Sequence, residues 1–195
     1  MIDKIMALIL LILLVPIVIP IILVQISAYG SKILFYQERG GLYGRAFTLI
    51  KFRTMIDKSD ISGKQLPDKQ RLTSSGRILR FLSLDELPNM INVLKGELSF
   101  VGPRPFPTSY FYLMNAEQKK RYSVRPGITG LAQIMGRNNL SWKTKIIYDL
   151  KYIENINFFG DLIILFKTFR HLFTNKRNED LGDQSIDTFI PNFDQ

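Results

Sequence analysis

The N-terminal apolar stretch constrains this chain more than any other feature. Residues 5–24, IMALILLILLVPIVIPIILV, form an unbroken run of 20 residues without a polar side chain. A straight helix of that length can cross a hydrocarbon core of roughly 30 Å. The run is too long for the core of a cleaved signal peptide, and no small-residue cleavage site directly follows it. The sequence therefore predicts a membrane segment over residues 1–30.

Two prolines leave the topology of this segment open. Pro16 and Pro20 each remove a helical hydrogen bond and press against the carbonyl four residues earlier. A sharp break there would return both ends to one membrane face, but proline also occurs in helices that span the bilayer. Under either topology, the basic residues that follow place the body of the chain on the cytoplasmic side. These residues are Lys32, Arg39, Arg45, Lys51 and Arg53.

The composition excludes several classes of active site and metal site. The chain has no cysteine, which excludes disulfides, iron–sulfur clusters, thiolate zinc sites and cysteine nucleophiles. Its single histidine, His171, lies in FKTFRHLF and is interpreted as a surface or interfacial side chain. Acid–base or nucleophilic catalysis would then require carboxylates, lysines or tyrosines. A bound metal is expected to be a hard, oxygen-bound cation. The net charge of +9 favours anionic partners such as lipid headgroups, nucleic acid or phosphorylated substrates.

Residues 31–177 are predicted to form one globular, mostly helical α+β body. Residues 33–37 and 46–53 are short aromatic and β-branched runs separated by ERGGLYGR, which predicts a hairpin and a small sheet. Residues 76–94 carry two helical patterns, the second of which ends at Gly96 as a glycine cap. An acidic tail over residues 178–195 follows, with five acids and no Lys or Arg, and is expected to be solvated.

Aromatic and basic residues alternate from Ser141 onward. This pattern, which includes Trp142 and Tyr152, is typical of amphipathic helices that lie in the headgroup plane. The alternative is an ordinary core face. Because a membrane segment is already predicted, interfacial packing is favoured over a core. The apolar positions in the last part of this pattern are Leu162, Ile163, Phe166, Phe169 and Phe173.

An acid pair in SLDELP is the candidate reactive group. Asp85 and Glu86 are predicted in the first turn of a helix, close to Arg77 and Arg80. One interpretation is structural, because Ser83 and Glu86 have the spacing of a capping box. The functional interpretation is an ionised carboxylate that binds magnesium and attacks phosphorus, with the helix end and arginines holding the phosphate.

Several other cations occur in rigid or motif-like settings, and the prolines and glycines of GELSFVGPRPFP and RPGITGLAQ predict two stiff, extended loops. Flanking prolines reduce the conformational entropy lost when a side chain is held in one orientation. The planar guanidinium group of arginine can donate two hydrogen bonds to one phosphate. Each cation alone is most simply a solvated charge, but together they indicate an anion site. They are Lys51 and Arg53 in KFRTM, Arg104 between two prolines, Arg125 in RPG and Arg137 in GRNN.

Three motifs carry a family resemblance. KFRTM, SLDELPNMINVLKGELSFVGPRP and RPGITGLAQIMGR, in this order, resemble the bacterial sugar transferase family of monotopic phosphoglycosyl transferases, and in particular its small PglC-like members. The resemblance implies an Mg²⁺-dependent transfer of a sugar-1-phosphate from a UDP-sugar to polyprenyl (undecaprenyl) phosphate. It also implies release of UMP, a covalent aspartyl-phosphosugar intermediate, and a place at the first membrane step of bacterial glycoconjugate assembly.

The resemblance also implies roles for individual residues. Asp85 matches the family's nucleophile and its metal-associated carboxylate, and Glu86 matches the partner glutamate that positions or deprotonates the lipid phosphate. The basic positions around the phosphates and uridine are matched by Lys51, Arg80, Arg104 and Arg137. Arg125 is added as a substrate-binding candidate from its stiff loop alone.

The family's membrane element is a helix-break-helix that re-enters on one face. Here Val15-Pro16 stands where the family commonly has Ser-Pro, so the hydroxyl that could satisfy a freed carbonyl is missing. The resemblance nevertheless favours a re-entrant segment with its break at Pro16. It implies a catalytic body on the cytoplasmic face of the bacterial inner membrane.

Three alternatives remain at this stage. The chain could be a membrane-tethered basic binding module, a glycosyl transferase that releases UDP, or a structural scaffold. A binding module would release no UMP, and release of UDP would distinguish an ordinary glycosyl transferase from a phosphoglycosyl transferase. Nucleic acid is not expected as a partner. The sugar cannot be read from the sequence, although small members suggest an N-acetylated hexose. Lipid length and oligomeric state, a homo-oligomer included, also stay open.

Overall fold

A computed structural model describes most of the chain. The described residues are 2–60, 63, 65–136 and 139–174. Contacts group the chain into two compact units, where the sequence predicted one globular body. The N-terminal unit comprises Met1–Gln37 and Ile50–Leu94, and the C-terminal unit comprises Glu38–Leu49 and Lys95–Gln195.

The predicted class, mostly helical with a small sheet, is confirmed. The first unit contains α1 (Ile2–Tyr29), α2 (Asp68–Arg71), α3 (Ser74–Leu82), the 3₁₀ turn η2 (Leu84–Glu86) and α4 (Asn89–Lys95). The second contains η1 (Leu42–Gly44), β3 (Ser99–Val101), α5 (Thr108–Leu113), α6 (Ala116–Lys119), η3 (Lys120–Tyr122), β4 (Gly127–Thr129), α7 (Leu131–Met135), α8 (Trp142–Glu154) and α9 (Phe158–Thr174). Strands β1 (Leu34–Gly40) and β2 (Ala46–Phe52) pair as a two-stranded hairpin.

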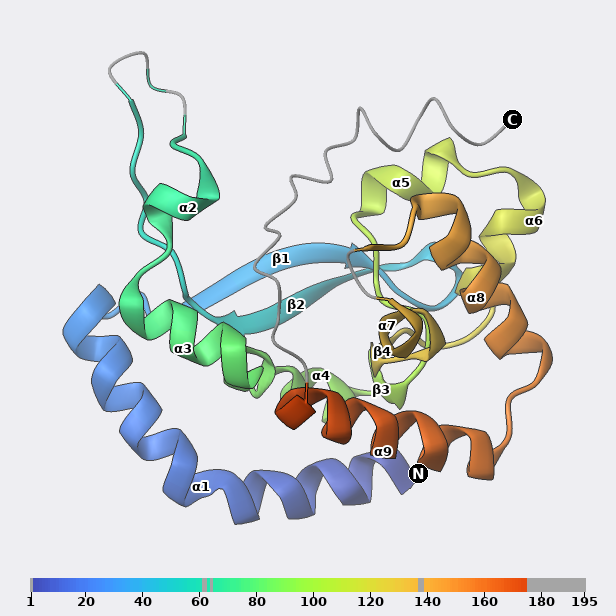
Figure 1. Ribbon diagram of the computed structural model, residues 1–195, viewed down its shortest axis with the longest axis horizontal. Coiled ribbons are helices and arrows are strands. Elements are labelled where there is room, and N and C mark those ends of the chain that lie inside the picture. The colour runs from blue at the N-terminus through green and yellow to red at the C-terminus, as the bar shows by residue number, and fades with distance from the viewer. Residues whose placement is uncertain (1, 61–62, 64, 137–138, 175–195) are drawn as a thin grey trace. The chain divides into compact units, whose positions relative to one another are not determined.

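Helix α1 is a single helix of 28 residues that contains both Pro16 and Pro20. The prolines do not interrupt it, but its ribbon changes direction sharply along its length (Figure 1). A bend without a full break is the expected result of proline inside a helix, because the ring displaces one carbonyl and removes one hydrogen bond.

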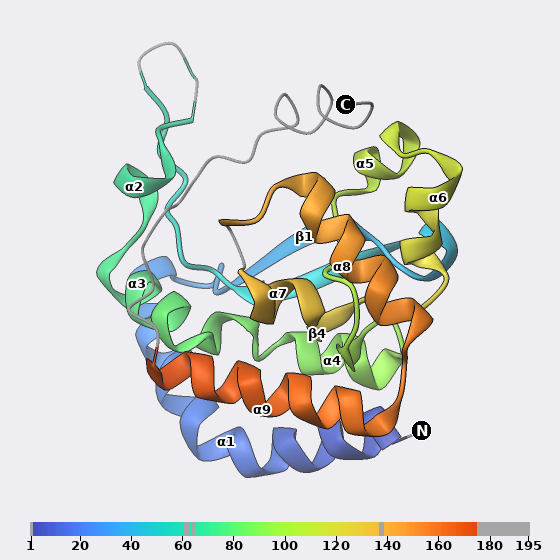
Figure 2. The ribbon, with the colours of Figure 1, turned by 45° about the vertical axis from the view of Figure 1, so that its right-hand side comes forward.

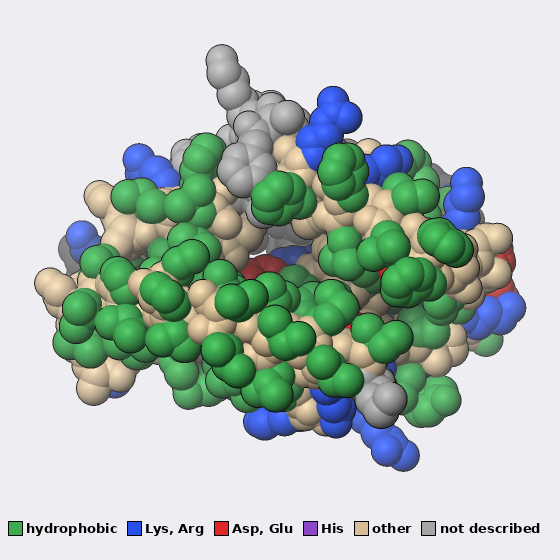
Figure 3. Space-filling view, turned by 90° about the horizontal axis from the view of Figure 1, so that it is seen from below, with side chains coloured by type: hydrophobic (Ala, Val, Ile, Leu, Met, Phe, Trp, Pro, Cys, Tyr) green, Lys and Arg blue, Asp and Glu red, His purple; other side chains and the backbone are tan. Residues whose placement is uncertain are grey.

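The surface of α1 is apolar. Of the residues in this helix, only Ala7 and Gln25 are buried, whereas Leu13 and Leu23 are 65% and 64% exposed. Figure 3, which views the structure from below Figure 1, shows hydrophobic side chains along this helix. Among the described residues, α1 is the one helix long and apolar enough to cross a membrane. An apolar surface of this extent is typical of membrane or protein contact.

The first strand is longer than predicted. The sequence indicated residues 33–37, but β1 continues to Gly40. The extension depends on distant residues, because the Gly40 N–H donates to the Phe106 carbonyl at 2.9 Å and Arg39 donates to the Pro105 carbonyl at 3.3 Å. No local pattern in the sequence predicts these contacts.

Helix α3 is anchored against the chain that follows β2. The Thr73 hydroxyl caps α3 by accepting from the Gly76 N–H at 3.0 Å, and it also lies 2.6 Å from the Tyr29 hydroxyl at the end of α1. A Cβ at Gly76 would lie 2.1 Å from the Thr54 carbonyl oxygen. The absence of a side chain at this position therefore lets α3 pack directly on that segment.

The two stiff loops predicted from GELSFVGPRPFP and RPGITGLAQ pair with each other. Strands β3 and β4 are parallel, with Ser99 opposite Gly127 and Val101 opposite Thr129. The backbones approach so closely that a Cβ at Gly127 would lie 2.1 Å from the Gly102 nitrogen. The sequence predicted extended loops but not their pairing.

Gly127→Ala is expected to destabilise the protein by about 3 kcal/mol or more, because its methyl group would meet backbone atoms that cannot yield. The measurement is thermal unfolding of the purified full-length chain. Gly160→Ala is the matched control, since its Cβ would meet only the Asn157 side chain, at 3.2 Å or more. The control should change stability by less than about 1 kcal/mol, and an equal effect of both substitutions would contradict the close-approach argument.

Aromatic side chains dominate the core of the C-terminal unit. Trp142 and Tyr152, predicted among interfacial rings, pack inward instead: Trp142 contacts the core and Tyr152 is 8% exposed. The prediction that α8 presents these rings to a headgroup plane is wrong, because Trp142 packs against Phe106 and the Tyr152 hydroxyl donates to the Asp161 carboxylate at 2.9 Å. Figure 2 shows α8 alongside α7. The buried cluster is Phe106, Tyr110, Met114, Tyr122 and Ile146.

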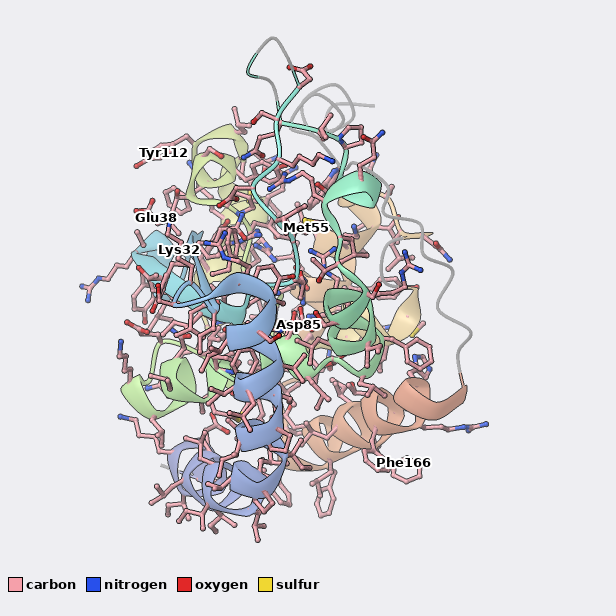
Figure 4. The ribbon with its side chains drawn as sticks, turned by 90° about the vertical axis from the view of Figure 1, so that its left-hand side faces the viewer. Lys32, Glu38, Met55, Asp85, Tyr112 and Phe166 are labelled. Atoms are coloured by element: carbon pink, nitrogen blue, oxygen red, sulfur yellow. The ribbon has the colours of Figure 1, made fainter. Side chains whose placement is uncertain are left out.

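Helix α9 has one packed side and one exposed apolar side. Ile164 is buried, and Asp161 and Thr168 bond to Tyr152 (2.9 Å) and Thr129 (2.7 Å). The four described apolar side chains are 45–69% exposed, so they do not form a core face, and their packing at a membrane interface stays a prediction. They are Leu162, Ile163, Phe166 and Phe169, and Figure 4 shows Phe166 projecting outward. The side chain of Phe173 lies outside the described residues.

Candidate functional site

The acid pair lies on a sharp turn between α3 and α4 (Figure 4). Ser83 ends α3 in the left-handed region, with φ +57° and ψ +21°, and its N–H donates to the Arg80 carbonyl at 3.2 Å. A non-glycine residue in this conformation is uncommon and often marks a functional turn. The next three residues form η2, which presents Asp85 and Glu86 with both side chains partly exposed.

The capping-box interpretation of Ser83 and Glu86 is wrong. The Ser83 side chain makes no capping hydrogen bond to the turn that it precedes. The expectation that the acids occupy the first turn of a longer helix is also wrong, since η2 has three residues and α4 begins only at Asn89. A turn of that length has little macrodipole, because the dipole sums over aligned peptide units. Neither structural reason therefore accounts for the acid pair.

Glu86 forms an ion pair with Lys51 instead. Lys51 Nζ lies 2.6 Å from Glu86 Oε1, and the two side chains are 18% and 19% exposed. Strand β2 carries the lysine, so the hairpin fixes the position of the glutamate from a point 35 residues away. Lys51, predicted as a phosphate ligand, thus contacts one of the two carboxylates directly.

Arg80 is held close to the same strand. Its Nε donates to the Thr54 hydroxyl at 2.9 Å, just beyond β2, and its side chain is half-buried. The N-terminal unit therefore brings Lys51, Arg80 and the acid pair onto elements joined by side-chain hydrogen bonds. Arg77 is exposed on the same helix.

The carboxylates suit one kind of magnesium site. Within the described part of the chain, no group of three or more His, Cys, Asp or Glu side chains could enclose a metal ion. Glu86 contacts the Lys51 ammonium group, and Asp85 precedes it on the same turn, so this turn supplies one or two carboxylates. Mg²⁺ commonly takes one or two carboxylates and completes its shell with substrate phosphates and water. Asp85 fits that mode.

Two of the other predicted cations, Arg104 and Arg125, belong to the C-terminal unit. Arg104 and Arg125 are both exposed, on loops that meet where the Gly127 N–H donates to the Pro103 carbonyl at 2.9 Å. Arg137 lies outside the described residues.

A buried ion pair that no local pattern predicts supports the Arg104 loop. Arg121 donates from Nε and Nη2 to Asp149 Oδ2 at 3.0 and 2.7 Å, with the side chains 1% and 3% exposed. The Arg121 Nη2 also donates to the Arg104 carbonyl at 2.7 Å, and its guanidinium stacks on Phe106 at 3.6 Å. Burial raises the pKa of Asp149, an effect that Arg121 opposes.

Lys145 completes a cationic cluster around this loop. Its ammonium group lies 4.6 Å from the Trp142 ring centroid. Burial and then the nearby Arg104 charge lower the pKa of Lys145 to about 8, while Asp149 acts in the opposite direction. Sequence analysis missed Arg121, Asp149 and Lys145 as site residues. The interleaving of bases and aromatics from Ser141 onward includes Lys145, but it indicated neither Arg121 nor Asp149.

Comparison with known proteins gives concordant results. Residues 1–175 match the model of a family described as "Bacterial sugar transferase". The chain is 52% identical over 147 residues to "Uncharacterized sugar transferase EpsL" of Bacillus subtilis (strain 168), covering 75% of this chain and 73% of that protein. It is 37% identical over 156 residues to "Exopolysaccharide production protein ExoY" of Rhizobium meliloti (strain 1021), covering 71% and 69%. It is 41% identical over 152 residues to "UDP-glucose:undecaprenyl-phosphate glucose-1-phosphate transferase" of Caulobacter vibrioides, covering 72% and 57%.

Proposed function

Because the chain belongs to the bacterial sugar transferase family, we propose that it transfers a sugar-1-phosphate from a UDP-sugar to polyprenyl phosphate and releases UMP. The names of the relatives support the general reaction, since one is a glucose-1-phosphate transferase and another an "Undecaprenyl-phosphate galactose phosphotransferase". The sugar is proposed to be an N-acetylated hexose by analogy with small members of the family.

The observation that carries this proposal is the position of the acid pair, on a turn that no helix cap explains and next to a lysine. Glu86 is bound to Lys51 at 2.6 Å, and Asp85 directly precedes it on that turn. Two neighbouring carboxylates in different local settings can perform two different tasks. Asp85 is assigned as nucleophile, and Glu86 as the residue that positions or deprotonates the incoming lipid phosphate.

The reaction then proceeds in two half-reactions. In the first, an Asp85 carboxylate oxygen bonds to the sugar-bearing phosphorus, and the bond from that phosphorus to the UMP oxygen breaks with its electron pair. In the second, an oxygen of polyprenyl phosphate bonds to the same phosphorus, and the aspartyl oxygen leaves as a regenerated carboxylate. Lys51 holds Glu86 in place through both steps.

Magnesium, held by Asp85 and substrate phosphates, would neutralise charge on the phosphoryl oxygens. The exposed guanidinium groups of Arg104 and Arg125 are assigned to the same anionic substrates. The role of Arg137 stays a prediction from the resemblance.

A membrane location follows from the lipid acceptor. The bent, apolar helix α1 supports a re-entrant segment in one leaflet, and the exposed apolar side of α9 supports contact of its own unit with a membrane. The catalytic body is assigned to the cytoplasmic face of the inner membrane. An enzyme anchored in this way meets the lipid phosphate at the headgroup plane without extracting the lipid.

The nucleotide product tests this function. The purified full-length chain is incubated with Mg²⁺, polyprenyl phosphate and each member of a UDP-sugar panel, and the released nucleotides are separated by chromatography. One donor is expected to yield UMP in equal amount to the lipid diphosphate sugar, and EDTA is expected to stop the reaction. Release of UDP would instead identify an ordinary glycosyl transferase. No lipid product from any donor would overturn the proposal.

A further inference from the structure

We propose that Lys145 acts together with Arg104 as a two-cation site for a substrate phosphate group. The inference rests on the proposed function, since the phosphate would belong either to the sugar nucleotide or to the polyprenyl phosphate. Lys145 lies on α8, outside every motif on which the family resemblance depends.

The first support is a continuous set of contacts between α8 and the Arg104 loop. Arg121 Nη2 donates both to the Arg104 carbonyl and to Asp149 Oδ2, each at 2.7 Å. Lys145 precedes Asp149 by four residues on α8, so the two side chains lie on the same face of the helix. The ion pair thus holds the Arg104 loop against the face that carries Lys145.

Aromatic packing provides a second, separate connection. The Phe106 and Trp142 ring centroids are 4.9 Å apart, and Lys145 Nζ lies 4.6 Å from the Trp142 centroid. Phe106 follows Arg104 by two residues, and the proline between them stiffens that segment. The ammonium group is therefore held by a rigid ring on the side of α8 that meets the Arg104 loop.

The charges around Lys145 favour an anion. Arg104 repels the ammonium group, and Asp149, its carboxylate neighbour on α8, attracts it while also forming the ion pair with Arg121. The η3 turn that packs on α8 contributes Arg121, Tyr122 and Lys120, the last of which pairs with Glu117, and α7 contributes no titratable side chain. A phosphate placed between Arg104 and Lys145 would relieve their repulsion, because it neutralises both cations.

The sign of the pKa shift provides a test that separates binding from structure. The pKa of Lys145 in the folded protein, about 8, lies below its ordinary value of 10.5. The folded protein therefore binds this proton more weakly than the unfolded chain. The charged form of Lys145 destabilises the folded protein fully below pH 8, and this destabilisation disappears as the pH rises towards 10.5. Lys145→Met should consequently leave the melting temperature at pH 7 unchanged or higher. A purely structural lysine would lower it.

Calorimetric binding needs no turnover, so it tests the site independently of the reaction. UDP and a short-chain polyprenyl phosphate in detergent are titrated separately into the full-length wild type and its variants. In Lys145→Met, the dissociation constant of at least one ligand is expected to rise roughly 10-fold or more, and the affected ligand identifies the source of the phosphate. Lys151→Met, an exposed lysine on the same helix, should change neither constant.

The pH dependence supplies a second readout. Wild-type affinity for the affected ligand should fall as the pH rises above about 8, whereas Lys145→Arg should retain its affinity because arginine stays charged. Unchanged dissociation constants for both ligands in Lys145→Met would overturn the inference. If the wild type transferred no phosphosugar but Lys145→Met still bound UDP more weakly, the proposed function would fail while the phosphate site stood.

Discussion

Replacing Asp85 with Asn is expected to abolish the covalent phosphosugar adduct and to lower the rate of transfer by a factor of about 10⁴ or more. The substitution keeps the shape of the side chain but removes the charge and the nucleophilic oxygen. The adduct is measured as a mass increase of the intact protein after incubation with Mg²⁺ and the active UDP-sugar, without lipid. Transfer is measured as lipid diphosphate sugar formed per minute.

Asp57→Asn is the matched control for this prediction. Asp57 is an exposed aspartate of the same unit that pairs with Arg53 at 2.8 Å, and its substitution should leave adduct and rate unchanged. Glu86→Gln extends the test, because the adduct should still form while its discharge to polyprenyl phosphate slows. Normal synthesis of the lipid product by Asp85→Asn would rule out the assigned nucleophile.

Asp149→Asn is expected to destabilise the chain by about 3–5 kcal/mol, because it leaves the Arg121 guanidinium buried without its counter-charge. Both side chains are almost fully buried, and Arg121 donates twice to the carboxylate. The melting temperature should fall by roughly 2–4 °C for each kcal/mol lost. Since Arg121 also holds the Arg104 carbonyl, the variant should also bind its phosphate ligand more weakly.

Glu117→Gln provides the contrast. Its ion pair with Lys120 has side chains that are 62% and 63% exposed, and surface pairs of this kind contribute at most about 1 kcal/mol. The double substitution Asp149→Leu with Arg121→Met should recover part of the stability of Asp149→Asn, since it removes both buried charges. A stable Asp149→Asn variant with unchanged melting would contradict the role given to this pair.

Local features of the chain were predictable because they depend on neighbouring residues. The hairpin follows from alternating β-branched and aromatic runs around a glycine-containing turn, and Gly96 ends α4 with a φ of +82° as a glycine cap does. The failures have equally specific causes. Ser83 and Glu86 have the spacing of a capping box, but the Glu86 carboxylate forms an ion pair with Lys51 instead. Trp142 and Tyr152 fit an interfacial pattern, but the core of their unit buries them.

The sequence by itself determined the apolar N-terminal helix, the mostly helical class, the acid pair and the family. These features depend on composition and on motifs within short segments. Only the tertiary structure decided which charges meet: Lys51 with Glu86, 35 residues apart, and Arg121 with Asp149, 28 residues apart. Partners at such separations are selected when packing excludes water and brings distant segments within hydrogen-bonding distance, and no local pattern encodes that choice.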